Sequence, residues 1–324
     1  MKPTVKTINT LEAGFSFLSS ILTRRQFISG MPLTAGIEIT NFCNLNCPEC
    51  ASGSDKMTRA RGFMTEKLFD KFIAESAPYL YNINLYFQGE PMLHPLFFDF
   101  IKKCGNVRIT VSTNGHFLTE ENSHKLAESA INKLIVSLDG MDMETYLKYR
   151  VGGDFEKVLS GIKIFSKELL RIKSSVKLEI QFLVNRYNEF QIPDIEKFAK
   201  EVKASLKLKS MQVLNNGKTE DWMPENKKFR RYRKNESGIF ELNNSFNNSC
   251  LRLWMNPVIT WDGKVIPCCF DKDANHVMGD LNEESLREIW HGEKFNLFRD
   301  AVLKGRQAIE ICRNCTSGLK GVNT

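Results

Sequence analysis

Residues 41–50 read NFCNLNCPEC and place Cys43, Cys47 and Cys50 within eight residues, in the spacing C-x3-C-x2-C. One loop of this length can supply three ligands to a single metal centre. A closed structural zinc site takes four protein ligands, and no fourth Cys or His lies in the same loop. An iron–sulfur cube needs one ligand for each iron. The loop therefore favours a 4Fe–4S cube with one iron open to an exchangeable ligand, while a zinc loop is the alternative.

The sequence around this loop alternates between two patterns. A short strand (GIEIT, residues 36–40) precedes it, and strand-like and helical runs then follow each other. Strands are predicted over residues 36–40, 83–87, 107–112, 134–138, 176–184 and 206–214. Helices are predicted over 65–77, 96–104, 120–130, 155–170 and 194–202, with Thr65, Thr119 and Asp154 as N-caps. Such alternation indicates an α/β protein with a parallel sheet covered by helices.

Three thiols directly after a first strand resemble the signature of the radical SAM superfamily. The resemblance implies a six-stranded partial (β/α)6 TIM-like barrel, whose active site lies at the C-terminal ends of the strands. It also implies that S-adenosylmethionine chelates the open iron and is cleaved reductively to a 5′-deoxyadenosyl radical, which abstracts a hydrogen atom from the substrate. The superfamily usually has an aromatic residue just before the third cysteine, whereas this chain has Glu49.

Polar residues at the predicted strand ends fit the same resemblance. Gln88-Gly89-Glu90 follows the second strand, where the superfamily has a Gly-Gly-Glu type motif that binds the methionine amino group; Gln88 replaces its first glycine. Gly89 allows close approach of the backbone, and Glu90 offers an acceptor to an ammonium group. The third and fourth strands end in STNG and SLDG, which are also good turn sequences. From these runs the resemblance implies ribose or carboxylate contacts by Ser112, Asn114, Ser137 and Asp139, with Arg150 as a further candidate.

A second group of cysteines lies near the C-terminal end: Cys250, Cys268, Cys312 and Cys315. Four thiols satisfy either an all-thiolate zinc site or a fully ligated cluster, and spacing alone does not separate these metals. The pattern resembles the SPASM or shorter twitch domain, which implies one auxiliary 4Fe–4S cluster and hence two clusters per chain. Cys269 is adjacent to Cys268 and would point to the opposite face of a strand, so the spacing after Gly263 favours Cys268, and Cys269 is either a buried thiol or a substitute ligand.

Composition and charge limit the cell compartment and the partners. Nine cysteines without a secretory signal or a membrane span predict a cytoplasmic protein that uses thiols for metal. The net charge of +7 is mild, and no nucleic-acid partner is expected. The basic run over residues 227–234 is predicted to be a solvated loop, with phosphate or nucleic-acid binding as the alternative. Leu11, Phe15, Leu18 and Leu22 recur at helical spacing, and we expect this stripe to pack on the barrel rather than on a membrane surface.

These patterns predict three segments: a helix and connector (1–34), a radical SAM barrel (35–217), and a linker with an auxiliary-cluster domain (218–324). The resemblance implies an oxidoreductase that receives electrons from a donor such as flavodoxin or ferredoxin and passes one to the auxiliary cluster. A small alcohol or sugar-derived substrate is favoured, because residues 1–34 are too few for a leader-peptide domain. A peptide-modifying maturase is the alternative, and an electron carrier or a zinc module is the non-enzymatic one.

Overall fold

The computed structural model describes residues 4–54, 56–214, 216–243 and 247–315. The chain divides into two compact units. Unit 1 comprises Met1–Phe42, Thr58–Thr110 and Phe246–Ser317, and unit 2 comprises Cys43–Met57, Val111–Ser245 and Gly318–Thr324. The predicted segments 1–34, 35–217 and 218–324 follow the chain instead and stay a prediction. They include residues 1–3, 55, 215, 244–246 and 316–324, which lie outside the described residues.

In unit 1 the strands pair in the order β11-β10-β9-β1-β2-β3. Their bounds are β1 (Thr34–Ile37), β2 (Asn82–Asn84), β3 (Arg108–Thr113, which continues into unit 2), β9 (Val258–Ile259), β10 (Lys264–Ile266) and β11 (Gly279–Asp280). β1 is parallel to β2 and also to β9, while β10 is antiparallel to both β9 and β11. The N–H groups of Gly36 and Glu38 donate to the carbonyls of Pro257 and Ile259, at 3.0 and 2.9 Å. Strands from the C-terminal part of the chain therefore extend the sheet, which is not limited to the six predicted strands.

The helices of unit 1 come from both ends of its sequence. They are α1 (Val5–Thr23), α2 (Glu66–Ser76), η1 (Pro91–Leu93), α3 (Phe97–Lys103), α9 (Arg252–Met255), α10 (Leu286–His291), α11 (Glu293–Gly305), η5 (Arg306–Ala308) and α12 (Glu310–Arg313). Ile83 of β2 and Ile109 of β3 are completely buried in the core. Asp262-Gly263 forms the turn of a hairpin: Gly263 has φ +92° between β9 and β10, a conformation that glycine adopts without strain.

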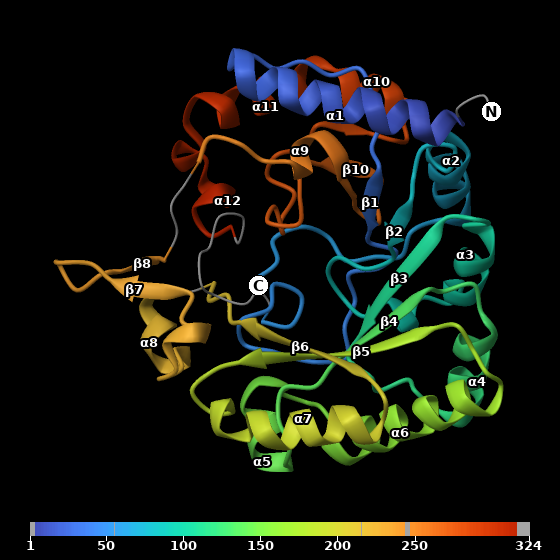
Figure 1. Ribbon diagram of the computed structural model, residues 1–324, viewed down its shortest axis with the longest axis vertical. Coiled ribbons are helices and arrows are strands. Elements are labelled where there is room, and N and C mark those ends of the chain that lie inside the picture. Colours follow the sequence, from blue (N-terminus) through green and yellow to red (C-terminus); the bar gives the residue numbers. More distant parts are fainter. Residues whose placement is uncertain (1–3, 55, 215, 244–246, 316–324) are drawn as a thin grey trace. The chain divides into compact units, whose positions relative to one another are not determined.

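Unit 2 has a parallel sheet in the order β3-β4-β5-β6. Its further strands are β4 (Lys133–Ser137), β5 (Lys177–Val184), β6 (Ser205–Ser210), and the separate hairpin β7 (Tyr232–Lys234) and β8 (Phe240–Leu242). Its helices are α4 (Glu120–Glu128), α5 (Met143–Tyr149), α6 (Phe155–Arg171), η2 (Glu189–Gln191), α7 (Ile192–Glu201), η3 (Asn216–Lys218), α8 (Thr219–Trp222) and η4 (Lys227–Phe229). Figure 1 shows α4, α6 and α7 along one side of β5 and β6. This arrangement confirms the predicted α/β class.

Most predicted elements are present within a few residues of their expected ends. The side chains of Thr65, Thr119 and Asp154 each accept a backbone N–H bond three residues later, so the predicted N-caps are confirmed. The sixth strand was expected to reach residue 214 but ends at Ser210. Helix α5 was not predicted, because its seven residues are too few for a clear apolar period. No described helix is both long and apolar enough to cross a bilayer.

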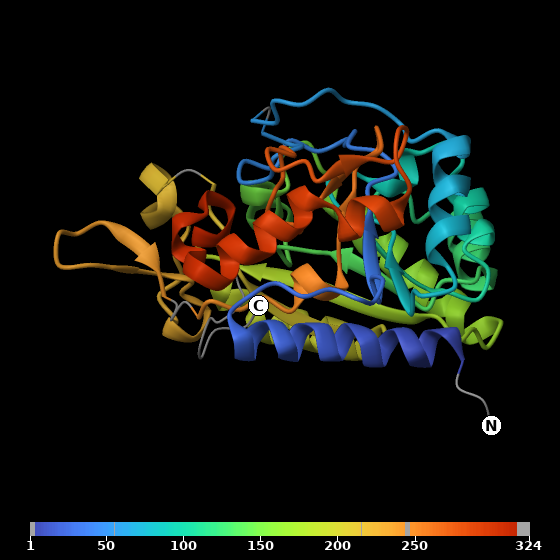
Figure 2. The ribbon, with the colours of Figure 1, turned by 90° about the horizontal axis from the view of Figure 1, so that it is seen from above.

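The expectation that the apolar stripe of the N-terminal helix packs on the sheet is wrong. Leu11, Phe15, Leu18 and Leu22 of α1 are 60–82% exposed. The buried face carries Asn9, Ala13, Ser16 and Ser20 instead. This face packs against residues 24–33, which run back along the helix (Figure 2). Helix α1 is therefore docked through polar side chains, and its large apolar side chains face outward.

Asn9 makes the tightest of these contacts. Its amide oxygen accepts the N–H of Met31 at 2.6 Å, and its amide nitrogen donates to the Met31 carbonyl at 3.1 Å, both in a buried position. Replacing Asn9→Ala leaves two buried backbone groups without partners, each of which costs about 1–3 kcal/mol. We therefore expect the free energy of unfolding to fall by about 2–4 kcal/mol in urea titrations followed by circular dichroism.

The matched control is Leu11→Ala, two residues away on the same helix. Leu11 is 69% exposed, so its truncation should change the free energy of unfolding by less than about 0.5 kcal/mol. A larger loss for Leu11→Ala than for Asn9→Ala would mean that the apolar stripe, not the polar face, holds the helix.

Candidate functional site

The loop that carries Cys43, Cys47 and Cys50 belongs to unit 2 and is tightly wound. The N–H of Cys50 donates to the Cys47 carbonyl at 3.2 Å, and both the N–H and the hydroxyl of Ser54 donate to the Cys50 carbonyl. A side chain at Gly53 would place its Cβ 2.6 Å from the Cys47 nitrogen. Cys47 is buried, Cys43 and Cys50 are half-buried, and all three are free thiols. The fold thus gathers three thiols on one compact turn.

Two side chains from later in the chain reach these thiols. The guanidinium of Arg150 lies 3.9 Å from the Cys47 sulfur, and the amide nitrogen of Asn114 lies 3.9 Å from the Cys43 sulfur. Burial raises the pKa of Cys47 to about 12, and the positive charge of Arg150 opposes this rise. Asn114 also donates to the Asn44 side chain at 2.7 Å. Arg150 and Asn114 are therefore placed to favour the ionised, metal-binding form of the loop.

Asp139 holds Arg150 in position. One carboxylate oxygen accepts the Arg150 Nε at 2.6 Å and its Nη2 at 2.5 Å, and the other accepts the N–H of Leu183 at 2.6 Å. Asp139 is almost completely buried, so both oxygens serve the protein itself. The predicted candidates Ser112 and Ser137 are half-buried near the ends of β3 and β4.

Glu49 occupies the position at which an aromatic residue was expected from the resemblance. Its side chain is buried, accepts the N–H of Leu214 at 2.7 Å and lies 3.8 Å from the Lys56 ammonium. Glu49 therefore ties the cysteine loop to the segment that follows β6. The carboxylate of Glu49 supplies the acceptor for the Leu214 N–H. The cysteine spacing gave no sign of this role.

The Gln88-Gly89-Glu90 motif belongs to unit 1, where it packs on the backbone of the residues after β1. Gly89 has φ +77°, and a Cβ at this position would lie 2.6 Å from the Phe42 carbonyl oxygen. The N–H of Glu90 donates to that same carbonyl at 2.7 Å. The Glu90 side chain is buried and accepts the N–H of Met92 at 3.1 Å. Only glycine fits at position 89, and it sets the motif against the residue that precedes Cys43.

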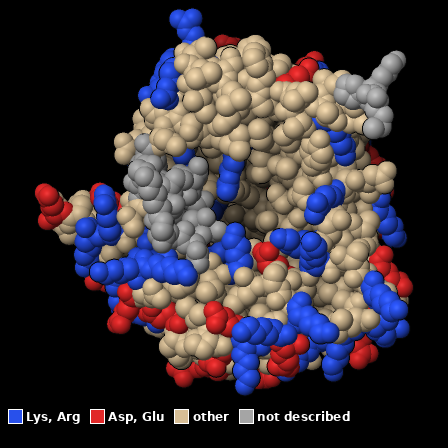
Figure 3. Space-filling model, viewed as in Figure 1, with Lys and Arg blue, Asp and Glu red and all other residues tan. Residues whose placement is uncertain are grey.

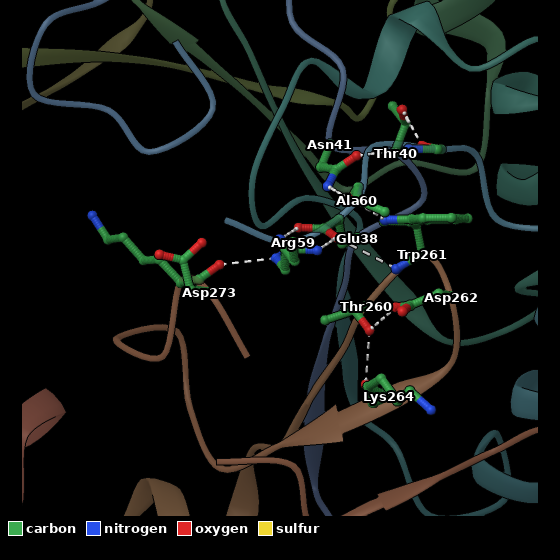
Figure 4. A network of polar contacts seen from close by, with 12 residues as sticks. Glu38, Thr40, Asn41, Arg59, Ala60, Thr260, Trp261, Asp262, Lys264 and Asp273 are labelled. Atoms are coloured by element: carbon green, nitrogen blue, oxygen red, sulfur yellow. Dashed lines mark hydrogen bonds and ion pairs between the residues drawn. The ribbon is translucent and has the colours of Figure 1, made fainter. Parts of the chain in front are cut away.

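A buried ion pair that the sequence did not predict lies at the end of β1 (Figure 4). The carboxylate of Glu38 is fully buried and takes two hydrogen bonds from the guanidinium of Arg59. Burial raises the pKa of Glu38 even though Arg59 opposes this. The Arg59 Nε donates to the Lys272 carbonyl at 3.0 Å, and the Trp261 N–H lies 3.4 Å from Glu38. This network joins the end of β1 to the β9–β10 hairpin and to the loop after Cys268. Its only sign in the sequence was a glutamate within the predicted strand of residues 36–40.

The second group of cysteines lies in unit 1, and Cys250, Cys268, Cys312 and Cys315 are all buried. Burial raises the pKa of Cys250, and it raises the pKa of Cys312 to about 11. The nearby thiols raise both pKa values further, whereas the positive charge of Arg306 lowers them. Arg306 is completely buried beside them. Cys269 is exposed, and its sulfur lies 2.9 Å from the Arg252 guanidinium. Cys268 therefore shares the buried environment of the other three thiols, whereas Cys269 is exposed. Arg252 lies near both positions, because Cys269 and the buried thiols Cys250, Cys268 and Cys315 all raise its pKa.

Both groups of thiols have the chemistry of iron–sulfur ligands, because a 4Fe–4S cube takes one thiolate for each iron. Within the described ranges no three His, Cys, Asp or Glu side chains are gathered as a single metal ion would require. Thiols with a nearby guanidinium at both places fit such anionic groups. These features define the class: an α/β protein equipped for iron–sulfur chemistry.

Comparison with known proteins gives the family. The family model described as "Radical SAM superfamily" matches residues 37–179, and the SPASM model, "Iron-sulfur cluster-binding domain", matches residues 250–316. The chain therefore contains a radical SAM superfamily domain followed by a SPASM domain, and its relatives include enzymes of the oxidoreductase type. The two domains imply S-adenosylmethionine and iron–sulfur clusters as cofactors.

Three relatives align over most of the chain. An AdoMet-dependent heme synthase of Methanosarcina barkeri is 28% identical, covering 89% of this chain and 92% of the relative. A tungsten-containing aldehyde ferredoxin oxidoreductase cofactor-modifying protein of Pyrococcus furiosus is 28% identical, covering 81% and 82%. An S-adenosyl-L-methionine-dependent 2-deoxy-scyllo-inosamine dehydrogenase of Niallia circulans is 24% identical, covering 87% and 91%.

Two solved structures share the fold. BtrN in complex with AdoMet and 2-DOIA is 20% identical, with a TM-score of 0.53 over 89% of this chain and 94% of that chain. SuiB of Streptococcus suis bound to S-adenosylmethionine is 14% identical, with a TM-score of 0.64 over 97% and 79%. At these identities the likeness concerns the fold alone.

The Glu38–Arg59 pair gives a prediction for stability. In Arg59→Met the Glu38 carboxylate stays buried without its cation, and we expect the free energy of unfolding at pH 8 to fall by about 3–5 kcal/mol. The folded-state pKa of Glu38 is raised, so the folded state holds a proton that the unfolded state has lost. Stability of the variant should therefore fall as pH rises above the unfolded pKa of about 4.3. Urea unfolding between pH 5 and pH 8 measures both effects.

The double variant Arg59→Met/Glu38→Gln is the control, because it removes the buried charge together with its partner. It should be more stable at pH 8 than Arg59→Met alone and should lose the pH dependence. A double variant no more stable than the single one would mean that Arg59 acts through its packing or its bond to Lys272, not through Glu38.

Proposed function

We propose that this chain is a radical SAM oxidoreductase that oxidises a small alcohol or sugar-derived molecule. In this proposal Cys43, Cys47 and Cys50 hold the catalytic 4Fe–4S cube, and Cys250, Cys268, Cys312 and Cys315 hold a single auxiliary cube. The family assignment and the three-thiol loop beside Arg150 are the observations that carry the catalytic half. The SPASM match and the shared burial of four thiols support the auxiliary half.

The fold and domain assignment that we propose follows from the same features. Strands β1–β6 with their helices would form the partial (β/α)6 barrel over residues 35–217, after the helix and connector of 1–34. Residues 218–324 would supply the linker and the auxiliary domain. The parallel register of β4, β5 and β6 and the SPASM match over 250–316 support this division.

In this proposal each of the site residues has a distinct task. The cofactor, when bound, supplies a 5′-deoxyadenosyl radical that takes a hydrogen atom from the substrate. Gly89 lets the backbone of its motif approach closely, and the buried Glu90 offers a carboxylate to the methionine ammonium together with Gln88. Asn114, Ser112 and Ser137 offer polar contacts at strand ends. Asp139 acts by positioning Arg150, whose charge offsets that of the thiolates.

The proposed oxidation needs an acceptor for one electron besides the radical that accepts the hydrogen atom. Oxidation of an alcohol carbon to a carbonyl removes one hydrogen atom, one proton and one further electron. The auxiliary cluster is the acceptor that we propose for that electron, and a flavodoxin or ferredoxin is the proposed donor that starts each cycle. The buried Arg306 favours this transfer, because a positive charge beside the thiolates stabilises the reduced, more negative cluster.

The relatives support a small molecule as the substrate. The three that align over more than four-fifths of this chain are named for heme synthesis, for a tungsten-enzyme cofactor and for 2-deoxy-scyllo-inosamine, and none is named for a peptide. The dehydrogenase among them is the model for the alcohol oxidation that we propose.

Cysteine substitutions test the assignment of the two centres. We expect about eight irons per chain after anaerobic reconstitution, and about four in either Cys50→Ala or Cys315→Ala. Cys50→Ala should form no 5′-deoxyadenosine with reductant, whereas Cys315→Ala should still form it without oxidising substrate. Iron and sulfide assays with chromatography of 5′-deoxyadenosine measure these outcomes. Cofactor cleavage by Cys50→Ala would contradict the catalytic assignment.

A separate experiment, the transfer of deuterium from substrate to 5′-deoxyadenosine, tests the substrate class. With 2-deoxy-scyllo-inosamine or a related aminocyclitol deuterated at its carbinol carbons, deuterium should appear in 5′-deoxyadenosine, and one carbonyl product should form per cofactor cleaved. Deuterium transfer from a peptide, and from no small alcohol, would replace this substrate class by peptide modification.

Arg306 gives a prediction that does not depend on the substrate. Arg306→Gln removes a buried positive charge beside the auxiliary thiols, so the midpoint potential of the auxiliary cluster should fall while that of the catalytic cluster stays unchanged. An EPR-monitored redox titration measures both. Arg313→Gln is the control, because Arg313 is exposed and donates to the Gln307 and Ala308 carbonyls. Equal shifts in both variants would contradict a local effect of Arg306.

A further inference from the structure

Unit 2 contains a cavity of about 420 Å³ in which basic side chains gather. Small-molecule sites measure roughly 300–1,000 Å³, so the size suits a small ligand. Five basic side chains and one acidic side chain line it, a formal excess of four positive charges: Arg186, Lys227, Arg230, Arg233, Lys234 and Glu220. Figure 3 shows Lys and Arg gathered over the β7–β8 hairpin. The run over residues 227–234 supplies four of these cations, and the loop after β5 supplies the fifth.

The walls of the cavity are fixed by hydrogen bonds between segments that are far apart in sequence. The N–H of Arg186 donates to the Trp222 carbonyl at 3.1 Å. The Glu189 carboxylate accepts the N–H groups of Glu225 and Asn226, at 2.7 and 2.9 Å. These bonds hold the loop after β5 beside the loop that leads into η4. A solvated charge run would not need such anchors.

The third wall is the strand β7. The Tyr232 hydroxyl accepts the N–H of Val213 at 3.1 Å and donates to its carbonyl at 3.3 Å, which pins β7 to the segment after β6. The Nε of Arg230 donates to the Pro224 carbonyl at 2.7 Å. This bond orients the guanidinium before any ligand arrives, so less side-chain entropy is lost on binding.

Only part of the positive charge is balanced within the protein. Arg233 pairs with Glu241 at 3.0 Å, and Lys234 pairs with Glu220 at 2.7 Å. Three further cations form no ion pair with any carboxylate in the described part of the chain: Arg186, Lys227 and Arg230. Because these three line one cavity, their charges reinforce each other there and favour an anion.

The remaining lining is apolar. Met223 and Tyr232 are buried, and Phe240 is half-buried, with the Lys234 ammonium 5.1 Å from the centre of its ring. An aromatic side chain beside cations offers a surface for a flat or hydrocarbon group. The cavity therefore combines an anion-binding rim with an apolar floor.

We propose that this cavity binds a small organic phosphate, with the phosphate among Arg186, Lys227 and Arg230 and its organic part against Phe240 and Met223. A phosphate group carries about −1.5 to −2 charges and three terminal oxygens, which matches three cations better than a single carboxylate does. The volume exceeds what a phosphate alone would fill, so an attached ring or chain is expected. The lining shares no residue with the proposed cysteine and methionine-binding residues, and the proposal does not depend on the proposed reaction.

Isothermal titration calorimetry of the full chain with its clusters loaded tests the proposal. ADP and inorganic pyrophosphate are the probes, in saturating S-adenosylmethionine so that adenine binding at the cofactor site is blocked. We expect ADP to bind more tightly than pyrophosphate. Lys227→Gln and Arg230→Gln should each weaken both probes about tenfold or more, whereas Phe240→Ala should weaken ADP alone.

Lys228→Gln is the matched control, because Lys228 is adjacent in sequence but lies over the Phe229 ring, outside the cavity lining. It should leave ADP affinity unchanged, and all variants should form 5′-deoxyadenosine like the unaltered chain. Absence of ADP binding, or ADP binding that the lining variants leave intact, would overturn the proposal. An equal loss in Lys228→Gln and Lys227→Gln, or preferential binding of single-stranded DNA, would also overturn it by indicating a diffuse basic surface.

Discussion

A thiol binds iron as a thiolate, and burial raises the free energy of the thiolate relative to the neutral thiol. Both cysteine groups of this chain meet that difficulty in the same way. Arg150 lies beside Cys47 in unit 2, and Arg306 lies beside Cys250 and Cys312 in unit 1. Arg306 is completely buried and the Arg150 side chain is 16% exposed, so water screens their attraction to sulfur less than it would at the surface. In our proposal these arginines make the cysteines usable as cluster ligands.

A buried guanidinium needs support of its own, and the surrounding structure provides it. Asp139 holds Arg150 and is in turn held by the N–H of Leu183 on β5. The sheet of unit 2 thereby fixes a charge that acts on the cysteine loop. At the other centre Arg306 donates to the Ser249 carbonyl at 3.3 Å, one residue before Cys250. Ligand placement and charge placement thus depend on the same strands and loops.

Local patterns in the sequence predicted much of this fold, because caps, turns and apolar periods act over a few residues. The N-caps at Thr65 and Asp154 are examples. The face of α1 was predicted wrongly, because periodicity locates an apolar stripe but does not say which side meets the protein. Asn9 and Ser20 dock that helix through backbone groups that no periodicity reveals.

Such local patterns could not predict which distant segments of the chain pair with each other. The parallel contact of β9 with β1 joins residues more than two hundred positions apart, and so does the bond from Arg59 to Lys272. For the cysteine groups the spacing identified the thiols, and the resemblance supplied Arg150 only as a candidate. Its place beside Cys47 depends on α5, a helix too short to predict. The spacing of the cysteines indicates candidate ligands, whereas the charged side chains beside them are placed by the tertiary structure.

The basic run over residues 227–234 shows why charge in a sequence is ambiguous. As a string it resembles a solvated loop, yet Phe229, Arg231 and Tyr232 are buried while Arg230 and Arg233 are exposed. The inward residues anchor the segment, and the outward ones are then held in fixed positions. Fixed cations cannot move apart to reduce their mutual repulsion, so an anion bound among them lowers the free energy more than it would on a mobile loop. The burial of three residues within the run is therefore what turns a charged segment into a candidate binding site.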